Sequence, residues 1–298
     1  MPQTDTTKQP TGLSLYTAAA TSASREVIRS YSTSFGVASN LLGRRVRSHV
    51  QNIYALVRVA DEIVDGAAAE AASKSAEISP RIELDEFEAE TYRAMRVGYS
   101  TNLVIHAFAS TARAVGIGED LVKPFFESMQ LDLWQKKHDE ESFERYVYGS
   151  AEVVGLMCLK AFVLGRKYTD RQTEQLIQSG RALGAAFQKV NFLRDLSADF
   201  RQLGRSYLPG VKVSQFDEEK KNFWVENIRA DIRLAAIGLK LLPISSRVAV
   251  TAALSLFNDL NEKIAQTPAD KVISSRISVG TSRKLWLVAR APFGAKLK

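Results

Sequence analysis

Residues 53–65 read IYALVRVADEIVD, and they belong to the most informative predicted helix of the chain. Four polar residues in it follow one another at spacings of four, three and four, which places them on one face of a helix: Tyr54, Arg58, Asp61 and Asp65. Nearly all the other positions are apolar, whereas a surface helix has a wide polar face. A thin polar stripe on an apolar cylinder predicts a buried helix whose stripe faces an internal polar cavity.

A second stretch, residues 188–199, repeats this design as QKVNFLRDLSAD. Its polar residues share one face at spacings of three, four and four: Gln188, Asn191, Asp195 and Asp199. One Asp-x-x-x-Asp pair on a helix is usually a solvated surface feature. Two pairs, each embedded in apolar sequence, predict that four carboxylates meet in one volume between facing helices.

Carboxylates in such a volume indicate a metal site, because unpaired buried charges are very costly. Carboxylate oxygens are the ligands that Mg²⁺ prefers, and two or three such ions would in turn hold a diphosphate. Arg58, Arg194 and Arg205 lie near the stripes and would add positive charge. Ionisation of an allylic diphosphate needs this stabilisation of its leaving group, and it needs an apolar pocket for the carbocation.

The rest of the chain is dominated by a period of 3.6 residues, which predicts one all-α domain. We assign residues 1–20 to a flexible tail, 21–290 to the domain and 291–298 to a basic tail. Residues 67–80 are expected to be a loose connector, and residues 204–216 an ordered loop. Ten helices are predicted, at residues 22–41, 47–65, 82–95, 102–115, 119–135, 142–164, 171–200, 218–242, 245–262 and 282–288.

Composition narrows the partners of this 298-residue chain, which carries a net charge of +7. The surplus of positive charge suits anionic partners. The basic residues are spread along the chain rather than gathered on one face, which disfavours nucleic acid as the partner. Cys158 is the single cysteine, so no intrachain disulfide forms, and its apolar surroundings predict a buried, inert thiol. With no signal peptide or membrane span in the sequence, a cytoplasmic protein is expected.

The basic and apolar segment 276–286, RISVGTSRKLW, is read by default as a solvated face. A peripheral contact with a membrane surface is the alternative for it. The sequence carries no indication of the oligomeric state.

Residues 53–65 and 188–199, the latter continued by GRSYLP at 204–209, resemble the two aspartate-rich motifs of phytoene and squalene synthases. The segment 31–35, YSTSF, is similar to the Ser/Phe motif of that family, which contacts diphosphate. The segment 146–155, YVYGSAEVVG, is similar to the central helix that lines its hydrocarbon tunnel. These matches occur in the order of the family and span residues 25–285.

The resemblance implies a single-domain isoprenoid synthase fold, a helical bundle around a central cavity. It also implies head-to-head joining of two prenyl diphosphates through a cyclopropylcarbinyl diphosphate, with Mg²⁺, or Mn²⁺ in its place, as the metal. Metal ligands would be Asp61, Asp65, Asn191, Asp195 and Asp199. Substrate contacts would come from Ser32, Ser34, Phe35, Tyr54, Arg58, Gln188, Asn191, Arg194, Arg205 and Tyr207, with Tyr146 beside the reacting centre and Val154 and Gly155 in the tunnel.

Substrate length remains open at this point. DEIVD and GRSYLP read more like phytoene synthases, which favours two geranylgeranyl diphosphates without NADPH over the farnesyl diphosphate of squalene and dehydrosqualene synthases. A terpene cyclase or a chain-elongating enzyme is a weaker alternative, because Asp-Asp-x-x-Asp is absent from both motifs. Ala198 departs from the family, which often has Glu before the last Asp of the second motif.

Overall fold

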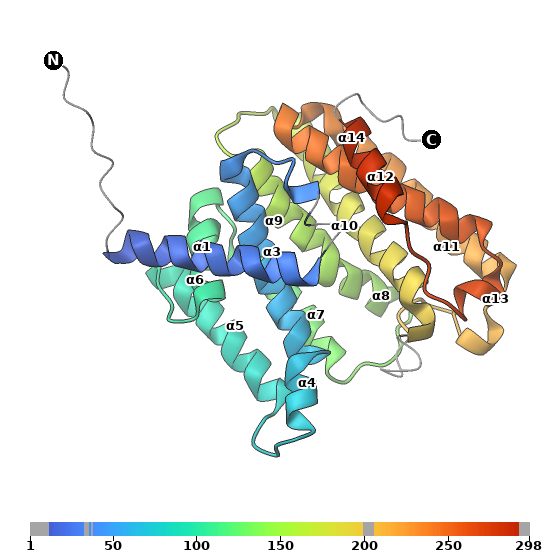
Figure 1. Ribbon diagram of the computed structural model, residues 1–298, viewed down its shortest axis with the longest axis horizontal. Coiled ribbons are helices and arrows are strands. Elements are labelled where there is room, and N and C mark those ends of the chain that lie inside the picture. Colours follow the sequence, from blue (N-terminus) through green and yellow to red (C-terminus); the bar gives the residue numbers. More distant parts are fainter. Residues whose placement is uncertain (1–11, 33–35, 37, 199–205, 292–298) are drawn as a thin grey trace.

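The computed structural model describes residues 12–32, 36, 38–198 and 206–291. Over these ranges the chain is helical and forms no strand, with one isolated parallel bridge between Lys137 and Ser206. The prediction of an all-α fold is therefore confirmed. The helices (Figure 1) are α1 (Gly12–Tyr31), α3 (Arg44–Val64), α4 (Ala67–Ala72), α5 (Pro80–Val97), α6 (Leu103–Val115), α7 (Glu119–Asp132), α8 (Glu140–Val147), α9 (Val153–Phe162), α10 (Asp170–Ala198), α11 (Glu218–Gly238), α12 (Ile244–Gln266), α13 (Ala269–Val272) and α14 (Thr281–Arg290).

The helices begin and end at residues that satisfy their unpaired backbone groups. Asn102 accepts hydrogen bonds from the backbone N–H groups of Val104 and Ile105 and so starts α6. Asp139 and Ser142 form a reciprocal capping box at the start of α8. Gly98 ends α5 in the left-handed conformation at φ 81°, where a side chain would be strained. Local sequence therefore fixes where the elements stop.

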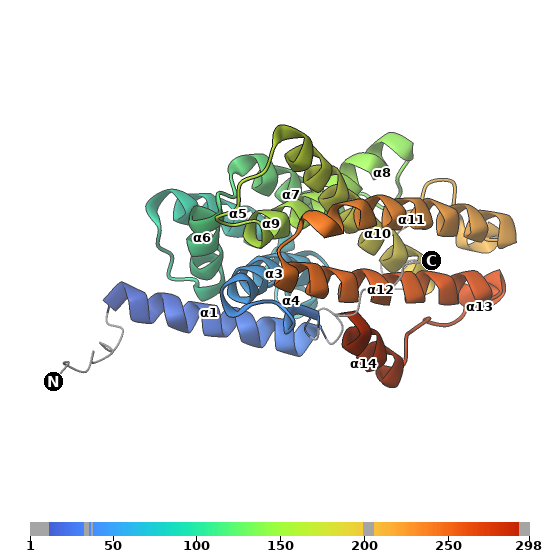
Figure 2. The ribbon, with the colours of Figure 1, turned by 90° about the horizontal axis from the view of Figure 1, so that it is seen from above.

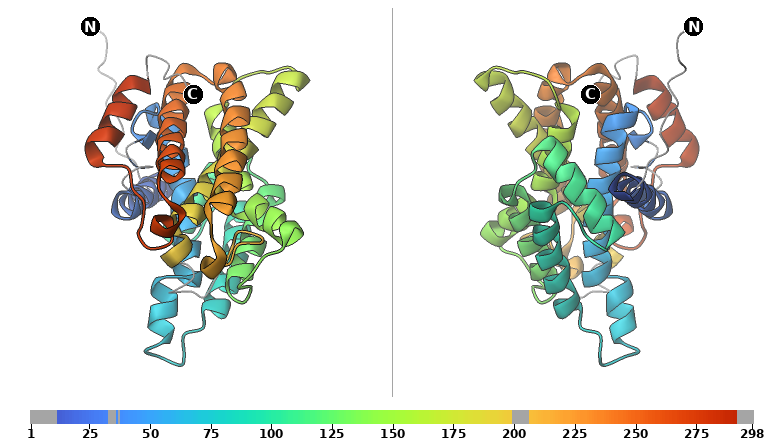
Figure 3. Two further views of the ribbon diagram at one scale, coloured as in Figure 1. Left: turned by 90° about the vertical axis from the view of Figure 1, so that its right-hand side faces the viewer. Right: turned by 90° about the vertical axis from the view of Figure 1, so that its left-hand side faces the viewer.

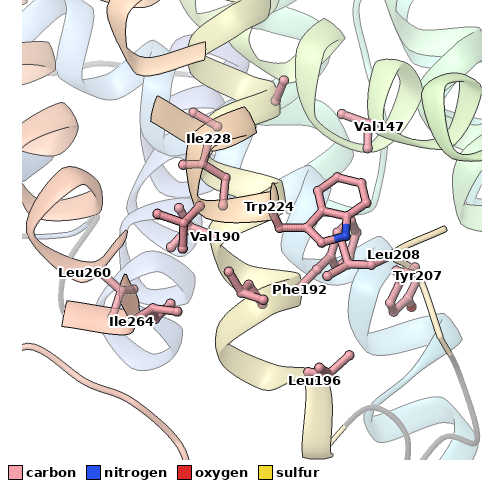
Figure 4. Packing of buried hydrophobic residues seen from close by; sticks show 14 of the residues in the cluster. Val147, Val190, Phe192, Leu196, Tyr207, Leu208, Trp224, Ile228, Leu260 and Ile264 are labelled. Carbon is pink, nitrogen blue, oxygen red and sulfur yellow. The ribbon is translucent and has the colours of Figure 1, made fainter. Parts of the chain in front are cut away.

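Helix α10 runs through the middle of the molecule, beside α9 and α11 (Figure 1). One core cluster joins α8, α10, α11 and α12, and Figure 4 shows Phe192 of α10 packed near Trp224 and Ile228 of α11. A second cluster joins α3, α5, α6, α7 and α9, with Phe125 and Phe126 of α7 fully buried in it. The predicted buried helices around residues 53–65 and 188–199 thus belong to different clusters.

Between α8 and α9 the chain forms a π-helical turn, η1 (Tyr148–Glu152), in which the N–H of Val153 donates to the carbonyl of Tyr148. The turn packs closely against α10. A methyl group on Gly184 would lie 2.4 Å from the carbonyl oxygen of Ala151, so only glycine allows this approach. Backbone contact of this kind places η1 and α10 side by side as walls of the site.

The N-terminal boundary differs from the predicted one. Helix α1 begins at Gly12, so residues 12–20 of the expected flexible tail are helical, with Ala20 fully buried. The Tyr16 hydroxyl donates to the carbonyls of Ser100 and Thr101 at 3.0 and 2.9 Å, which fixes this end of α1. The predicted connector 67–80 likewise contains the short helix α4. Alanine-rich sequence, as in α4, forms helix readily. The hydrophobic pattern of the sequence does not reveal the contacts of Tyr16 that hold the start of α1.

Helices α1 and α14 lie along the same side of the molecule (Figure 2), and α4 and α5 extend to one end (Figure 3). No helix in the described part of the chain combines the length and apolarity needed to cross a bilayer.

Candidate active site

A cavity of about 810 Å³ opens between α3, η1, α9, α10 and α12. Much of its wall is apolar, and the rings of Phe187 and Phe257 stack in this wall with centroids 3.8 Å apart. Phe162 and Cys158 of α9 also line it. Burial raises the pKa of the Cys158 thiol to about 12, which fits the inert thiol expected from the sequence. Such a wall suits a long hydrocarbon and excludes water.

Polar residues of both predicted stripes line the same cavity. Helix α3 contributes Tyr54 and Arg58, and α10 contributes Gln188, Asn191 and Arg194. The structure therefore brings Tyr54 and Arg58 of one stripe and Gln188 and Asn191 of the other to one volume, but Asp61, Asp65 and Asp195 are not among the residues that line it. The guanidinium of Arg58 lies 4.5 Å from the ring centroid of Tyr31, and its buried Nε has no hydrogen-bond partner among the described residues.

Three further residues of the predicted site also line this cavity: Ser32, Val154 and Gly155. Four others lie outside the described residues: Ser34, Phe35, Asp199 and Arg205.

Asp61 lies one turn beyond Arg58 in a group of carboxylates. Burial raises the pKa of the Asp61 carboxyl to about 7, Arg58 opposes the rise, and Asp132, Asp65 and Glu62 add to it. Arg58 also pairs with Glu62 and approaches Asp61 to 4.0 Å. The Asp61 side chain keeps 41 % of its surface accessible. A cation can therefore reach it.

Asp195 of the second stripe is held by two guanidinium groups. Arg194 Nε lies 3.0 Å from both carboxylate oxygens, and Arg276 Nε lies 2.9 Å from Oδ1. Arg276 comes from the segment between α13 and α14, and it lines the cavity together with Lys284 of α14. Arg58, Arg194, Arg276 and Lys284 thus bring four cationic side chains to one cavity.

Sequence reasoning missed the part that Arg276 and Lys284 play, because the basic segment 276–286 was read as a solvated face. Arg276 does keep 69 % of its side chain exposed, but it also contacts Asp195. The available signal was the alternation of basic and apolar residues there, which allows one side to line a cavity.

Tyr146 and Tyr207 are not among the residues that line the cavity; they meet at Asp132 of α7 instead. Asp132 is buried and accepts hydrogen bonds from the hydroxyls of Tyr146 at 2.7 Å and Tyr207 at 3.0 Å. The Tyr207 ring stacks on Phe192 at 4.3 Å and on His138 at 5.8 Å. Since the charge of Asp132 also raises the pKa of Asp61, this buried cluster lies near the first stripe.

A divalent cation fits the chemistry of the carboxylate group around Asp61. Within the described ranges, no three acidic, histidine or cysteine side chains form a metal site by themselves. Mg²⁺ commonly binds one or two protein carboxylates and takes its remaining oxygens from water and substrate phosphates. A cation there would also stabilise the charged form of Asp61, which its surroundings disfavour. The donor set therefore suits Mg²⁺ bound together with a diphosphate.

Comparisons with known proteins agree with this geometry. Residues 28–283 match the squalene/phytoene synthase family. Phytoene synthase 2 of Oryza sativa subsp. japonica is 27 % identical over 278 residues, covering 87 % of this chain and 67 % of that protein. Phytoene synthase 1 of Arabidopsis thaliana is 27 % identical over 87 % of this chain and 63 % of its own length. The phytoene synthase of Cereibacter sphaeroides is 28 % identical, covering 91 % of this chain and 81 % of that protein. The chain thus spans about two thirds of the plant relatives.

Solved structures share the fold. A dehydrosqualene synthase crystal structure superposes with a TM-score of 0.74 at 18 % identity, covering 93 % of this chain and 96 % of that one. A squalene synthase from Alicyclobacillus acidocaldarius gives 0.70 at 20 % identity, covering 84 % and 94 %.

Proposed function

The chain belongs to the squalene/phytoene synthase family, and we propose that, as a prenyltransferase of the phytoene synthase type, it joins two isoprenoid diphosphates head to head. One observation supports this more than any other. A single cavity has a long apolar wall with stacked aromatic rings and also carries Arg58, Arg194 and Arg276. A prenyl diphosphate has the same two parts, a hydrocarbon chain and a highly charged head.

The residues of the cavity have distinct tasks in this reaction. Arg58, Arg194 and Arg276 bind diphosphate and offset the charge that develops as the C–O bond breaks. The paired rings of Phe187 and Phe257 present π-faces to the cationic carbon chain and keep water from it. The guanidinium groups thus favour ionisation, and the apolar wall protects the carbocation from water.

Mg²⁺ would be held by Asp61, Asp65, Asn191 and Asp195, with Asp199 as the remaining predicted ligand. When bound, the metal supplies positive charge to the leaving diphosphate. The chain prepares this role by gathering carboxylates around Asp61, so that metal binding releases the proton favoured by the raised pKa.

We propose geranylgeranyl diphosphate as the substrate, supported by the named phytoene synthase relatives. In the first step one diphosphate leaves, the allylic carbon bonds to the double bond of the second substrate, and loss of a proton closes a cyclopropane. In the second step the other diphosphate leaves, the skeleton rearranges and a second proton is lost. Two diphosphates and two protons balance the formation of phytoene, so no reductant such as NADPH is needed.

Farnesyl diphosphate is the second candidate substrate, favoured by the likeness of the fold to dehydrosqualene and squalene synthases. The test is to incubate the purified protein with each diphosphate separately, with Mg²⁺ and without NADPH, and to identify products by mass spectrometry. Phytoene from the twenty-carbon substrate is expected. Dehydrosqualene or presqualene diphosphate would move the assignment to the thirty-carbon branch, and no product from either substrate would refute the proposal.

We further propose a cytoplasmic enzyme whose α14 contacts a membrane surface. Trp286 is 43 % exposed on α14, and the guanidinium groups of Arg283 and Arg290 lie 4.5 and 4.6 Å from its ring. An aromatic residue between cations suits the interface of an anionic bilayer. Sedimentation with anionic vesicles, in wild type and Trp286→Ser, tests this contact; equal binding of the two proteins would contradict it.

A further inference from the structure

A second hollow of about 750 Å³ lies between α1 and the start of α3, outside the cavity described above. Four arginines line it, Arg25 and Arg29 from α1 and Arg44 and Arg47 from α3. We call this hollow the basic groove. Its other lining side chains are mostly small and polar: Thr21, Ser22, Ser32, Ser39, Asn40, Ser48 and Gln51.

The arginines of the basic groove are poorly compensated. Arg29 pairs with Glu26 at 3.2 Å, but both side chains are mostly exposed, so the pair is weak. Arg47 donates to the backbone carbonyls of Asn40 and Leu42, which neutralises no charge. Arg25 and Arg44 form no ion pair within the part of the chain that the structure describes. The groove is therefore a concentrated positive region.

Gln51 gives an independent sign that a polar ligand belongs there. Gln51 is buried, with only 6 % of its surface accessible, and it lines the basic groove. Its amide has no hydrogen-bond partner among the described residues and is not sealed from solvent, so a molecule in the groove can reach it. Its neighbour Asn52, by contrast, donates to the carbonyl of Ala107 and the hydroxyl of Thr111. An oxygen-rich ligand in the groove would satisfy the free amide of Gln51.

The basic groove adjoins the cavity. Ser32 and Ser39 line both hollows. One face of α3 carries four polar residues at spacings of four, three and four: Arg47, Gln51, Tyr54 and Arg58. The first two line the groove and the last two line the cavity. An anion held in the groove would thus lie at the edge of the site without occupying it.

From these observations we propose that the basic groove is a second anion site, which binds a phosphate or diphosphate group. Guanidinium forks match phosphate oxygens in bidentate geometry, and arginine is weakly hydrated, so four of them favour this ligand over a simple halide. The phosphate comes from a free diphosphate or from the headgroup of an anionic lipid. The proposal does not rest on the proposed function, because it concerns a hollow outside the cavity.

Calorimetry with inorganic pyrophosphate, in EDTA and at low salt, tests the site without metal or turnover. The double variant Arg25→Gln/Arg44→Gln should weaken binding by at least about tenfold, since it removes two charged donors. The matched control is Arg45→Gln/Arg233→Gln, which removes the same charge from exposed positions outside the groove. This control should bind nearly as wild type does. Thermal melting confirms that both double variants fold.

A local measurement separates the groove from the cavity. The Gln51 side-chain amide, assigned by its loss in Gln51→Leu, should shift in the NMR spectrum when pyrophosphate is added. The shift should persist in Arg276→Gln, which alters only the cavity, and disappear in Arg25→Gln/Arg44→Gln.

Vesicles distinguish the two sources of phosphate. If pyrophosphate leaves the Gln51 amide unchanged but phosphatidylglycerol vesicles bind wild type and the control better than Arg25→Gln/Arg44→Gln, the site takes a lipid headgroup. The proposal is overturned if groove and control variants behave alike with both ligands. Loss of prenyl transfer activity would not affect either result, so failure of the proposed function remains distinguishable.

Discussion

Replacing Arg276 by Gln tests the cationic part of the cavity most directly. The change removes the 2.9 Å contact to Asp195, but Arg194 still neutralises that carboxylate. Because the Arg276 side chain is 69 % exposed, the lost pair should cost at most about 1 kcal/mol of folding free energy, or about 2 °C in Tm. Loss of a charged hydrogen bond to diphosphate should cost about 1.5–3 kcal/mol, or roughly 10- to 150-fold in kcat/KM.

The assay follows product formation and thermal melting in the same preparations. Arg283→Gln is the matched control, because Arg283 comes from the same C-terminal segment as Arg276 and also pairs with an aspartate, Asp259 of α12, but does not line the cavity. It should lose stability to a similar small extent and keep its kcat/KM. Arg276→Lys, which keeps the charge but not the fork, should fall between Arg276→Gln and wild type. Equal kcat/KM in Arg276→Gln and Arg283→Gln would refute the reasoning, and so would a large loss of Tm in Arg276→Gln alone.

Three further measurements test other parts of the structure. Asp61→Asn should abolish turnover and flatten the pH dependence of Tm measured in EDTA. The pKa of Asp61 is raised from 3.8 to about 7 in the folded protein. Its contribution to the stability of the metal-free protein is therefore full below pH 4 and is lost as the pH rises to 7. An unchanged pH profile would contradict this. Gly184→Ala should destabilise by about 1–3 kcal/mol in denaturant melts, whereas Gly280→Ala, whose new methyl group meets nothing within 4 Å, should not. Cys158, with a pKa of about 12, should react slowly with a thiol-specific disulfide reagent at pH 8 until the protein unfolds; rapid labelling of the native protein would contradict the raised pKa.

Helical periodicity was enough to predict most of the helices, because each long helix has a clear apolar face. The stretch 53–65 was predicted as a buried helix with a polar stripe, and α3 has Ile53, Leu56 and Ala60 fully buried opposite it. The start of α1 at Gly12 was missed, since residues 12–20 carry little apolar pattern and are fixed by contacts distant in sequence, such as Tyr16 with Ser100. Local patterns do not contain such contacts.

The candidate site was predictable to the extent that it repeats at helical spacing. Tyr54, Arg58, Gln188 and Asn191 were identified from the two stripes, and they line one cavity. Arg276 was not, because it lies on an irregular segment that no periodicity describes. The link from Asp132 to Tyr146 and Tyr207 joins three parts of the chain, and only the folded structure brings them together.

The π-helical turn η1 has a consequence for how this protein can change over generations. Upstream of it Tyr146 points to Asp132, and downstream Val154 and Gly155 line the cavity. The wider turn takes up one residue more than a turn of α-helix, so removing one of residues 148–152 would restore regular winding with little rotation of α9. Tyr146 and Val154 could then keep their present neighbours, but the wide turn that packs against α10 would be lost. Substitutions of Gly149 should be purged, because a methyl group there would lie 2.1 Å from the carbonyl oxygen of Pro124.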